Sequence, residues 1–249
     1  MKYIFFFILI SSTVLAQEVL SPLLSSPRSL EQNMSVSKSS LSIPFFDDFS
    51  TNQLNVNKWI GNSTLINNNY PVNPPTIGVV TFDGLDSNGF AYDINISNNS
   101  GVADQLLSQD IDLSNVDTAF FLFYYQPQGY GDNPQIEDSL FLEFLSDSSG
   151  VKSWRKVWAV PGNNLHEFKK NVIMIYDQDF LHNSFQFRFI NYATLSGNFD
   201  HWHIDYVKLD NYFSPVDTSD LNDVSFVYDS PSFLKRYNEM PWLHFINNF

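Results

Sequence analysis

Residues 184–192 read SFQFRFINY and carry the clearest strand pattern of the chain. Phe185, Phe187 and Phe189 fall on one face of an extended strand, and the polar residues between them fall on the other. Strict alternation of this kind is typical of an antiparallel strand with one face in a core and one face in water. The stretch therefore predicts a β-sheet that packs through a phenylalanine-rich face.

Short apolar runs of similar length recur along the chain, separated by clusters of Asn, Asp, Ser, Gly and Pro. Residues 119–126 read AFFLFYYQ, which is apolar on both faces and predicts a central strand. The other runs are residues 43–49, 76–82, 139–145, 154–160, 171–176 and 202–209. No segment keeps a capped helical period, so we expect an all-β fold, an antiparallel two-sheet jelly-roll sandwich.

The last of these runs breaks the alternation in its middle. Trp202 and Ile204 share one face, whereas Val207 and Leu209 have the opposite parity. A β-bulge near Asp205 would place all four apolar side chains in the core and redirect the aspartate.

The first sixteen residues predict a cleaved signal peptide. A positive Lys2 precedes an apolar run of about a dozen residues, and Val14 and Ala16 are spaced for cleavage before Gln17. The alternative is a membrane anchor, but a spanning helix needs about 20 apolar residues. No later stretch is long and apolar enough to span a bilayer, so we expect an exported bacterial protein that is secreted or lies at the cell surface.

The changes of composition predict four segments. Residues 1–16 are the signal peptide, 17–42 a serine-rich flexible linker, and 43–212 the sandwich. Residues 213–249 open with an acidic linker and are too few to bury a core of their own. They are either a tail that docks on the sandwich or the start of a second module of a longer chain.

The composition excludes several classes of function. There are 27 acidic and 13 basic residues, a net charge of −14, and no basic patch, which argues against nucleic acid as a partner. The chain has no cysteine, which excludes disulfides, cysteine nucleophiles and cysteine-bound zinc.

Several motifs in chain order resemble a known family. They are FFDDF at 45–49, PPTIGVVTFDGL at 74–85, ADQLLS at 103–108, IDLS at 111–114, FYYQPQG at 123–129, FQFRF at 185–189 and DHWHIDYV at 200–207. Together they resemble the MAM-like or concanavalin-like jelly-roll module of long secreted Bacteroidota surface proteins. The resemblance implies the fold over residues 43–212, a surface setting and a module without catalytic activity. Longer members of that family often end in a type IX secretion sorting domain, which this chain does not show.

Asp47, Asp48 and Asp205 are candidate calcium ligands. In jelly-roll modules the first and the last core strand lie side by side, and an acidic residue from each often holds a structural Ca²⁺. Carboxylates and backbone carbonyls are the ligands that Ca²⁺ prefers. The alternative is that Asp47 and Asp48 mark the end of a strand, in contact with water or backbone amides.

His201, His203 and Asp205 form a second candidate metal site. Alternation along a strand would place the three on one face, a plausible arrangement for zinc or another transition metal. No fourth ligand or general base is indicated, however, and a bulge would break the shared face. The favoured interpretation is two surface histidines that flank a buried Trp202.

The loop of residues 126–132 is the candidate ligand site. Aromatic faces can stack on the apolar face of a sugar ring, and loop aromatics are more accessible than strand aromatics. Tyr130 lies in this loop, with Gln128 and Asp132 as polar neighbours for sugar hydroxyls. The alternative is that tyrosine is simply frequent in this chain.

Catalysis has weak support. Glu137, Asp138 and Glu143 include the carboxyl pairs that a glycosidase would need, yet Glu143 is expected on the wet face of a strand. No nucleophile elbow, zinc-protease motif or phosphate loop occurs. We therefore expect a non-catalytic recognition or adhesion module that binds a surface glycan or protein. A structural spacer is the alternative, and a glycan-directed hydrolase comes third.

Overall fold

The computed structural model describes residues 25–26, 40–51, 53–61, 63–95 and 99–212, and these residues form an all-β fold without a helix. One sheet has five strands in the order β10-β9-β12-β6-β3. Its strands are β3 (Trp59–Ile60), β6 (Ser100–Ser108), β9 (Ser139–Ser148), β10 (Val151–Pro161) and β12 (Phe187–Thr194).

The second sheet has six strands, in the order β11-β8-β13-β5-β4 with β2 beside β13. Its strands are β2 (Phe45–Asp47), β4 (Leu65–Asn67), β5 (Val79–Phe82), β8 (Ala119–Pro127), β11 (Lys169–Ile175) and β13 (Trp202–Asp210). A short parallel pair joins β1 (Leu41–Ser42) to β7 (Ile111–Asp112), whereas the pairs within the two large sheets are antiparallel.

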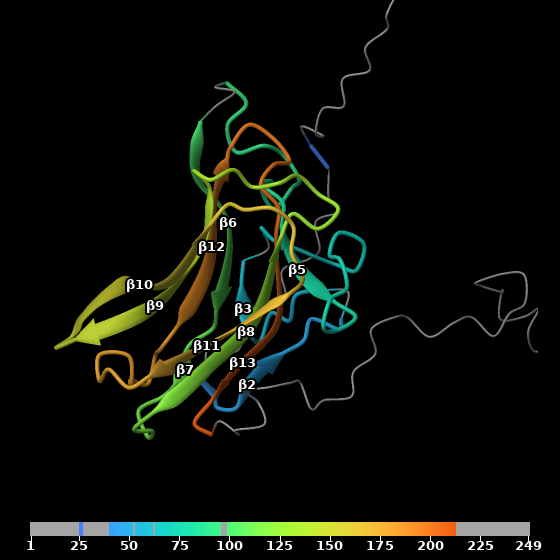
Figure 1. Cartoon of the computed structure of the whole chain (residues 1–249). Coiled ribbons are helices and arrows are strands. Elements are labelled where there is room, and N and C mark those ends of the chain that lie inside the picture. Colours follow the sequence, from blue (N-terminus) through green and yellow to red (C-terminus); the bar gives the residue numbers. More distant parts are fainter. Residues whose placement is uncertain (1–24, 27–39, 52, 62, 96–98, 213–249) are drawn as a thin grey trace, which may run out of the picture.

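The two sheets lie face to face, with β9 and β10 extending to one side as a long hairpin (Figure 1). From β10 onward, each strand along the chain lies in the sheet opposite to its predecessor. This alternation between sheets gives the expected jelly-roll sandwich.

Phenylalanine rings from both sheets fill the space between them. Phe121 of β8 meets Phe187 of β12 at a centroid distance of 4.5 Å and an interplanar angle of 67°. Phe123 meets Phe189 in the same way at 5.0 Å. The alternation that the sequence shows at residues 185–189 therefore builds the core, because all three phenylalanines there are fully buried.

The predicted bulge is present in β13. The pairing of β13 with β8 shifts register between Asp205 and Lys208, and Tyr206 has a φ of 53°. Trp202, Ile204, Val207 and Leu209 are all fully buried. One extra residue thus restores the inward parity of the strand, as expected for a bulge.

Several strands differ from the sequence prediction. The short strands β1, β3, β4 and β7 were not predicted, and β1 lies within the segment expected to be a linker. The first run, expected over residues 43–49, is a strand only at Phe45–Asp47. The nine-residue β6 was not among the predicted strands, because Gly101, the buried Asp104 and the exposed Val102 disturb its alternation.

None of the described residues belongs to a helix that is long and apolar enough to cross a membrane. The predicted signal peptide at residues 1–16 and the segment 213–249 lie outside the described residues.

Candidate functional site

The predicted ligand loop follows β8 directly and presents one open aromatic ring. Tyr130 is 76% exposed, the highest value among the large apolar and aromatic side chains described as exposed. Its neighbours Gly129 and Pro127 are buried. The loop thus lies against the protein while its tyrosine faces water.

Hydrogen bonds fix the backbone of this loop at several points. The amide of Gln128 donates to His201 O at 2.7 Å, and the amide of Tyr130 donates to Tyr70 O at 2.7 Å. Within the loop, the amide of Gly131 donates to Gln128 O at 2.9 Å. The chain before and after Tyr130 is therefore held to two distant segments.

His203 supports the loop from the face of β13 opposite to the core residues Trp202 and Ile204. Its Nδ1 lies 2.8 Å from Thr81 Oγ1, which in turn accepts a hydrogen bond from Asn67 Nδ2 at 2.7 Å. Thr81 therefore donates to Nδ1, and Nε2 carries the proton that it donates to Gln128 O at 3.2 Å. Burial lowers the pKa of His203 to about 3, so the ring is neutral at neutral pH.

His201 holds the other end of the loop. Its Nδ1 accepts a hydrogen bond from the amide of Asp132 at 2.9 Å, and its ring stacks on Tyr70 at 5.3 Å with an interplanar angle of 25°. Burial lowers the pKa of His201 to about 4.

The expectation of two surface histidines at 201 and 203 is wrong. Both are buried. Both ring nitrogens of His203 and Nδ1 of His201 contact groups that are far away in the sequence, whereas His201 Nε2 is buried without a partner. Asp205, the third member of the predicted zinc set, instead bonds Thr76.

Two glycines let the loop approach the histidines. Gly129 has a φ of +58°, and a Cβ there would lie 2.2 Å from Tyr70 O and 2.4 Å from His203 Nε2. A Cβ on Gly131 would lie 2.4 Å from the Cγ of His201. In the sequence, this close packing could have been predicted from the two glycines that flank Tyr130, since glycine allows a close approach of the backbone.

The other two predicted ligand residues serve the loop itself. Gln128 Oε1 accepts a hydrogen bond from the amide of Leu165 at 3.3 Å. Asp132 Oδ2 accepts one from the amide of Asp200 at 3.3 Å, and partial burial raises the pKa of Asp132. Of the three residues, Tyr130 is the one that the structure leaves open to a ligand.

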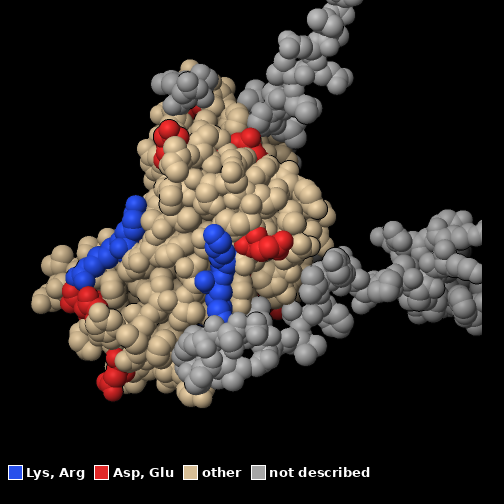
Figure 2. Space-filling model, in the orientation of Figure 1, with Lys and Arg blue, Asp and Glu red and all other residues tan. Residues whose placement is uncertain are grey.

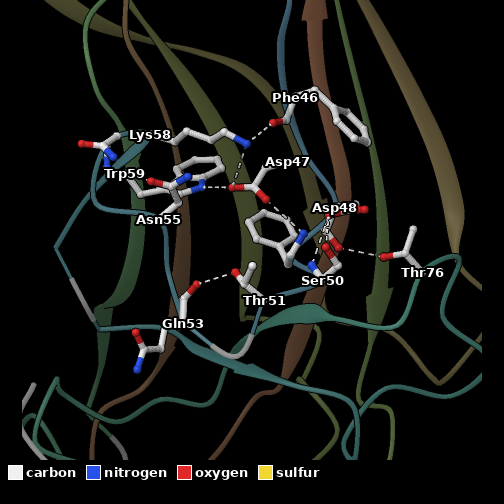
Figure 3. A network of polar contacts seen from close by, with 12 residues as sticks. Phe46, Asp47, Asp48, Ser50, Thr51, Gln53, Asn55, Lys58, Trp59 and Thr76 are labelled. Carbon is white, nitrogen blue, oxygen red and sulfur yellow. Dashed lines mark hydrogen bonds and ion pairs between the residues drawn. The ribbon is translucent and has the colours of Figure 1, made fainter. Parts of the chain in front are cut away.

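Asp47, one of the predicted calcium ligands, points toward Trp59 and Lys58 (Figure 3). Its Oδ2 accepts a hydrogen bond from Trp59 Nε1 at 2.7 Å and lies 3.8 Å from Lys58 Nζ. Its Oδ1 accepts from the amide of Phe49 at 3.1 Å.

Asp48 and Asp205 meet at Thr76 instead. Thr76 Oγ1 lies 2.8 Å from the backbone oxygen of Asp48 and 2.9 Å from Asp205 Oδ1. The Asp205 carboxyl also accepts hydrogen bonds from the amides of Thr76 and Tyr206. Burial raises the pKa of Asp205 to about 7 despite these donors.

The residues considered for catalysis do not converge. Glu143 forms an ion pair with Arg188 at 2.6 Å, whereas Asp138 is buried at the entrance of β9 and Glu137 is exposed. Among the residues that the structure describes, no three histidine or acidic side chains are placed so that they could hold a metal ion.

No model of a known protein family matches the chain, and no curated protein matches it in sequence. Solved structures do resemble it. A Family 16 carbohydrate-binding module is 8% identical with a TM-score of 0.38, covering 61% of this chain and 89% of that chain. The K1 adhesin domain of Lys-gingipain from Porphyromonas gingivalis W83 is 13% identical with a TM-score of 0.33, covering 68% and 98%.

A third similar structure is the module CBM27-1 of Caldicellulosiruptor saccharolyticus in complex with mannohexaose. It is 9% identical with a TM-score of 0.35, covering 61% of this chain and 84% of that chain. At these identities and TM-scores the similarities assign neither a ligand nor an activity to this chain.

Proposed function

We propose that the chain is a secreted, non-catalytic recognition module that binds surface glycans through Tyr130. The observation that supports this most is the combination of a 76% exposed ring with a backbone fixed on both sides of it. Binding then orders little more than the tyrosine side chain, and the cost of ordering a loop is avoided.

The chemistry of the loop suits a sugar ring. An aromatic face attracts the apolar face of a pyranose, and the phenol hydroxyl adds a polar group at its edge. The net charge of −14 favours uncharged sugars as ligands, because a negative protein surface repels anionic polymers. On the face that Figure 2 shows, charged side chains are few and scattered among uncharged residues.

The expected affinity of a single site is low. One stacking contact contributes about 1 kcal/mol, whereas a dissociation constant of 1 mM already requires about 4 kcal/mol. Useful adhesion therefore needs further contacts around Tyr130 and several copies, whose linkage raises the overall affinity.

A glycan array with the biotinylated chain, made tetravalent on streptavidin, tests the proposal. We expect binding to a set of neutral glycans that Tyr130→Ala abolishes. Tyr176→Ala is the matched control, because Tyr176 is 66% exposed and lies at the end of β11, away from the loop. If no glycan is bound, or if both variants bind like the wild type, the proposal is contradicted and a structural spacer becomes the favoured function.

A further inference from the structure

The outer face of the six-stranded sheet is apolar where β11, β8, β13 and β2 lie side by side (Figure 1). Alternate residues of β8 belong to the core cluster, so the residues between them, Phe120, Leu122 and Tyr124, point outward. Leu122 is buried although it does not belong to that cluster. The outer face of an antiparallel sheet is usually polar where it meets water, so an apolar row here indicates a surface that is covered in use.

The edge strand β11 extends this row on one side. Val172 pairs with Leu122 and Met174 pairs with Phe120, so their side chains lie on the same face. Val172 is 39% exposed and Met174 is 54% exposed.

Aromatic rings of β13 and β2 extend the row on the other side. The ring of Tyr206 lies 6.2 Å from that of Tyr124 and 4.8 Å from that of Phe46. The side chains that make up this surface come from four neighbouring strands, and we call them the outer apolar face: Phe46, Phe120, Tyr124, Val172, Met174 and Tyr206.

Two lysines lie on the same side of the sheet. Lys170 of β11 pairs with Tyr124, and Lys208 of β13 pairs with Leu122. The surface therefore combines apolar side chains with positive charge, although the chain as a whole has a net charge of −14.

The chain leaves the sheet beside this face. β13 ends at Asp210, which pairs with Phe120, and the described residues end at Tyr212. Neighbouring strands lie about 4.8 Å apart, so β11 is about 10 Å from β13. An extended chain spans about 3.3 Å per residue, and about ten residues after Tyr212 are therefore enough to reach any part of the face.

The sequence that follows the described residues matches the face in polarity and in charge. An acidic stretch at residues 217–223 is followed by the apolar run VSFVY at 224–228 and by MPWLHF at 240–245. Apolar side chains gain free energy by leaving water, and the outer apolar face offers them a surface close by in the chain. The acidic stretch complements Lys170 and Lys208, because opposite charges attract.

We propose that residues 213–249 dock on the outer apolar face of the same chain. The apolar runs of the segment cover the aromatic and aliphatic side chains of the face, and its acidic stretch lies near the two lysines. Covalent linkage favours this occupant over a second copy, because it gives the segment a high effective concentration, whereas two copies of net charge −14 repel each other. The inference does not depend on glycan binding at Tyr130.

The absence of cysteine from the chain allows a site-specific crosslinking test. The full chain carrying Met174→Cys is labelled with a benzophenone maleimide and irradiated, and the joined peptides are identified by mass spectrometry. We expect the label at position 174 to join residues 213–249 in a product with the mass of a monomer. Val151→Cys is the control and should give no such product, because Val151 is 69% exposed on β10 of the other sheet.

Tryptic digestion of the full chain gives an independent measure. Lys235 and Arg236 are the trypsin sites within residues 213–249. Met174→Glu places a negative charge in the apolar face, so it should release the segment and make cleavage at these sites about tenfold faster. Val151→Glu is the matched control and should leave the rate unchanged.

Two results would overturn the proposal. One is a label at position 174 that joins a second copy, or that joins residues 213–249 no more than the label at position 151 does. The other is cleavage of Met174→Glu at the rate of the wild type.

Discussion

The backbone oxygen of Gln128 lies 3.2 Å from Nε2 of the fully buried His203. Through this contact a buried residue of β13 helps to position the loop that carries Tyr130. The exposed ring is thus linked to Thr81 and Asn67 on β5 and β4 by a continuous row of hydrogen bonds. Under the proposed function, recognition by Tyr130 depends on the buried side chains of His203 and Thr81.

Gly129→Ala tests the close approach of the loop to this histidine. A Cβ at Gly129 would overlap Tyr70 O and His203 Nε2, so we expect the free energy of unfolding to fall by more than about 2 kcal/mol. Urea denaturation measures the loss. Gly150→Ala is the control, because it also has positive φ but meets nothing within 4 Å, and it should cost about 1 kcal/mol. Equal losses in the two variants would contradict the packing described for the loop.

The stability of the protein should depend on His203 at mildly acidic pH. The pKa of His203 is about 3 in the folded protein, compared with an ordinary value of 6.5, which we take for the unfolded chain. At a pH between these two values the unfolded chain therefore binds more protons than the folded protein. The contribution of His203 is therefore present above pH 6.5 and is lost as the pH falls toward 3.

His203→Gln replaces the ring by a neutral donor and acceptor. We expect the variant to lose less stability than the wild type between pH 7 and pH 5, by urea denaturation at each pH. Other titrating groups are common to both proteins and cancel in the comparison. Identical pH slopes would show that His203 is not buried in its neutral form.

Asp47 should stabilise the fold through Trp59. Asp47→Ala leaves the indole Nε1 of the buried Trp59 without its acceptor, which costs about 1–3 kcal/mol. Chemical denaturation measures this loss. Asp112→Ala also removes an aspartate that bonds a nearby serine, but on the surface, and it should cost less. A loss at Asp47 no larger than at Asp112 would count against the buried contact.

Export should remove the first sixteen residues. N-terminal sequencing of secreted material is expected to begin at Gln17, because Val14 and Ala16 provide the cleavage spacing. Secreted protein that still carries Met1 would refute the signal peptide.

Alternation in the sequence predicted much of the fold, but it did not predict the partners of polar residues. The burial of the phenylalanines at 185–189 and the bulge near Asp205 were predicted correctly, because successive residues of a strand point to opposite faces of the sheet. β6 was missed, because its buried Asp104 does not follow the hydrophobic pattern.

The candidate site was predicted only in part. Tyr130 is exposed as expected, whereas His201 and His203 are buried, contrary to expectation. Strand pairing places Thr81 beside the buried His203 across a separation of 122 residues, and the ring of His201 stacks on Tyr70. Asp132 and Asp200 likewise meet across 68 residues, a spacing that forms no motif. The Ca²⁺ site at Asp47, Asp48 and Asp205 remains a prediction.

The most direct test of the account compares Tyr130→Phe with Tyr130→Ala on a glycan surface that the wild-type chain binds. Phenylalanine keeps the stacking face and alanine removes it, so the first variant should retain most of the binding. The second should lose about fivefold or more per site, as expected for a contact of about 1 kcal/mol. If Tyr130→Ala binds as tightly as the wild type in a titration with the tetravalent chain, Tyr130 is not the recognition residue.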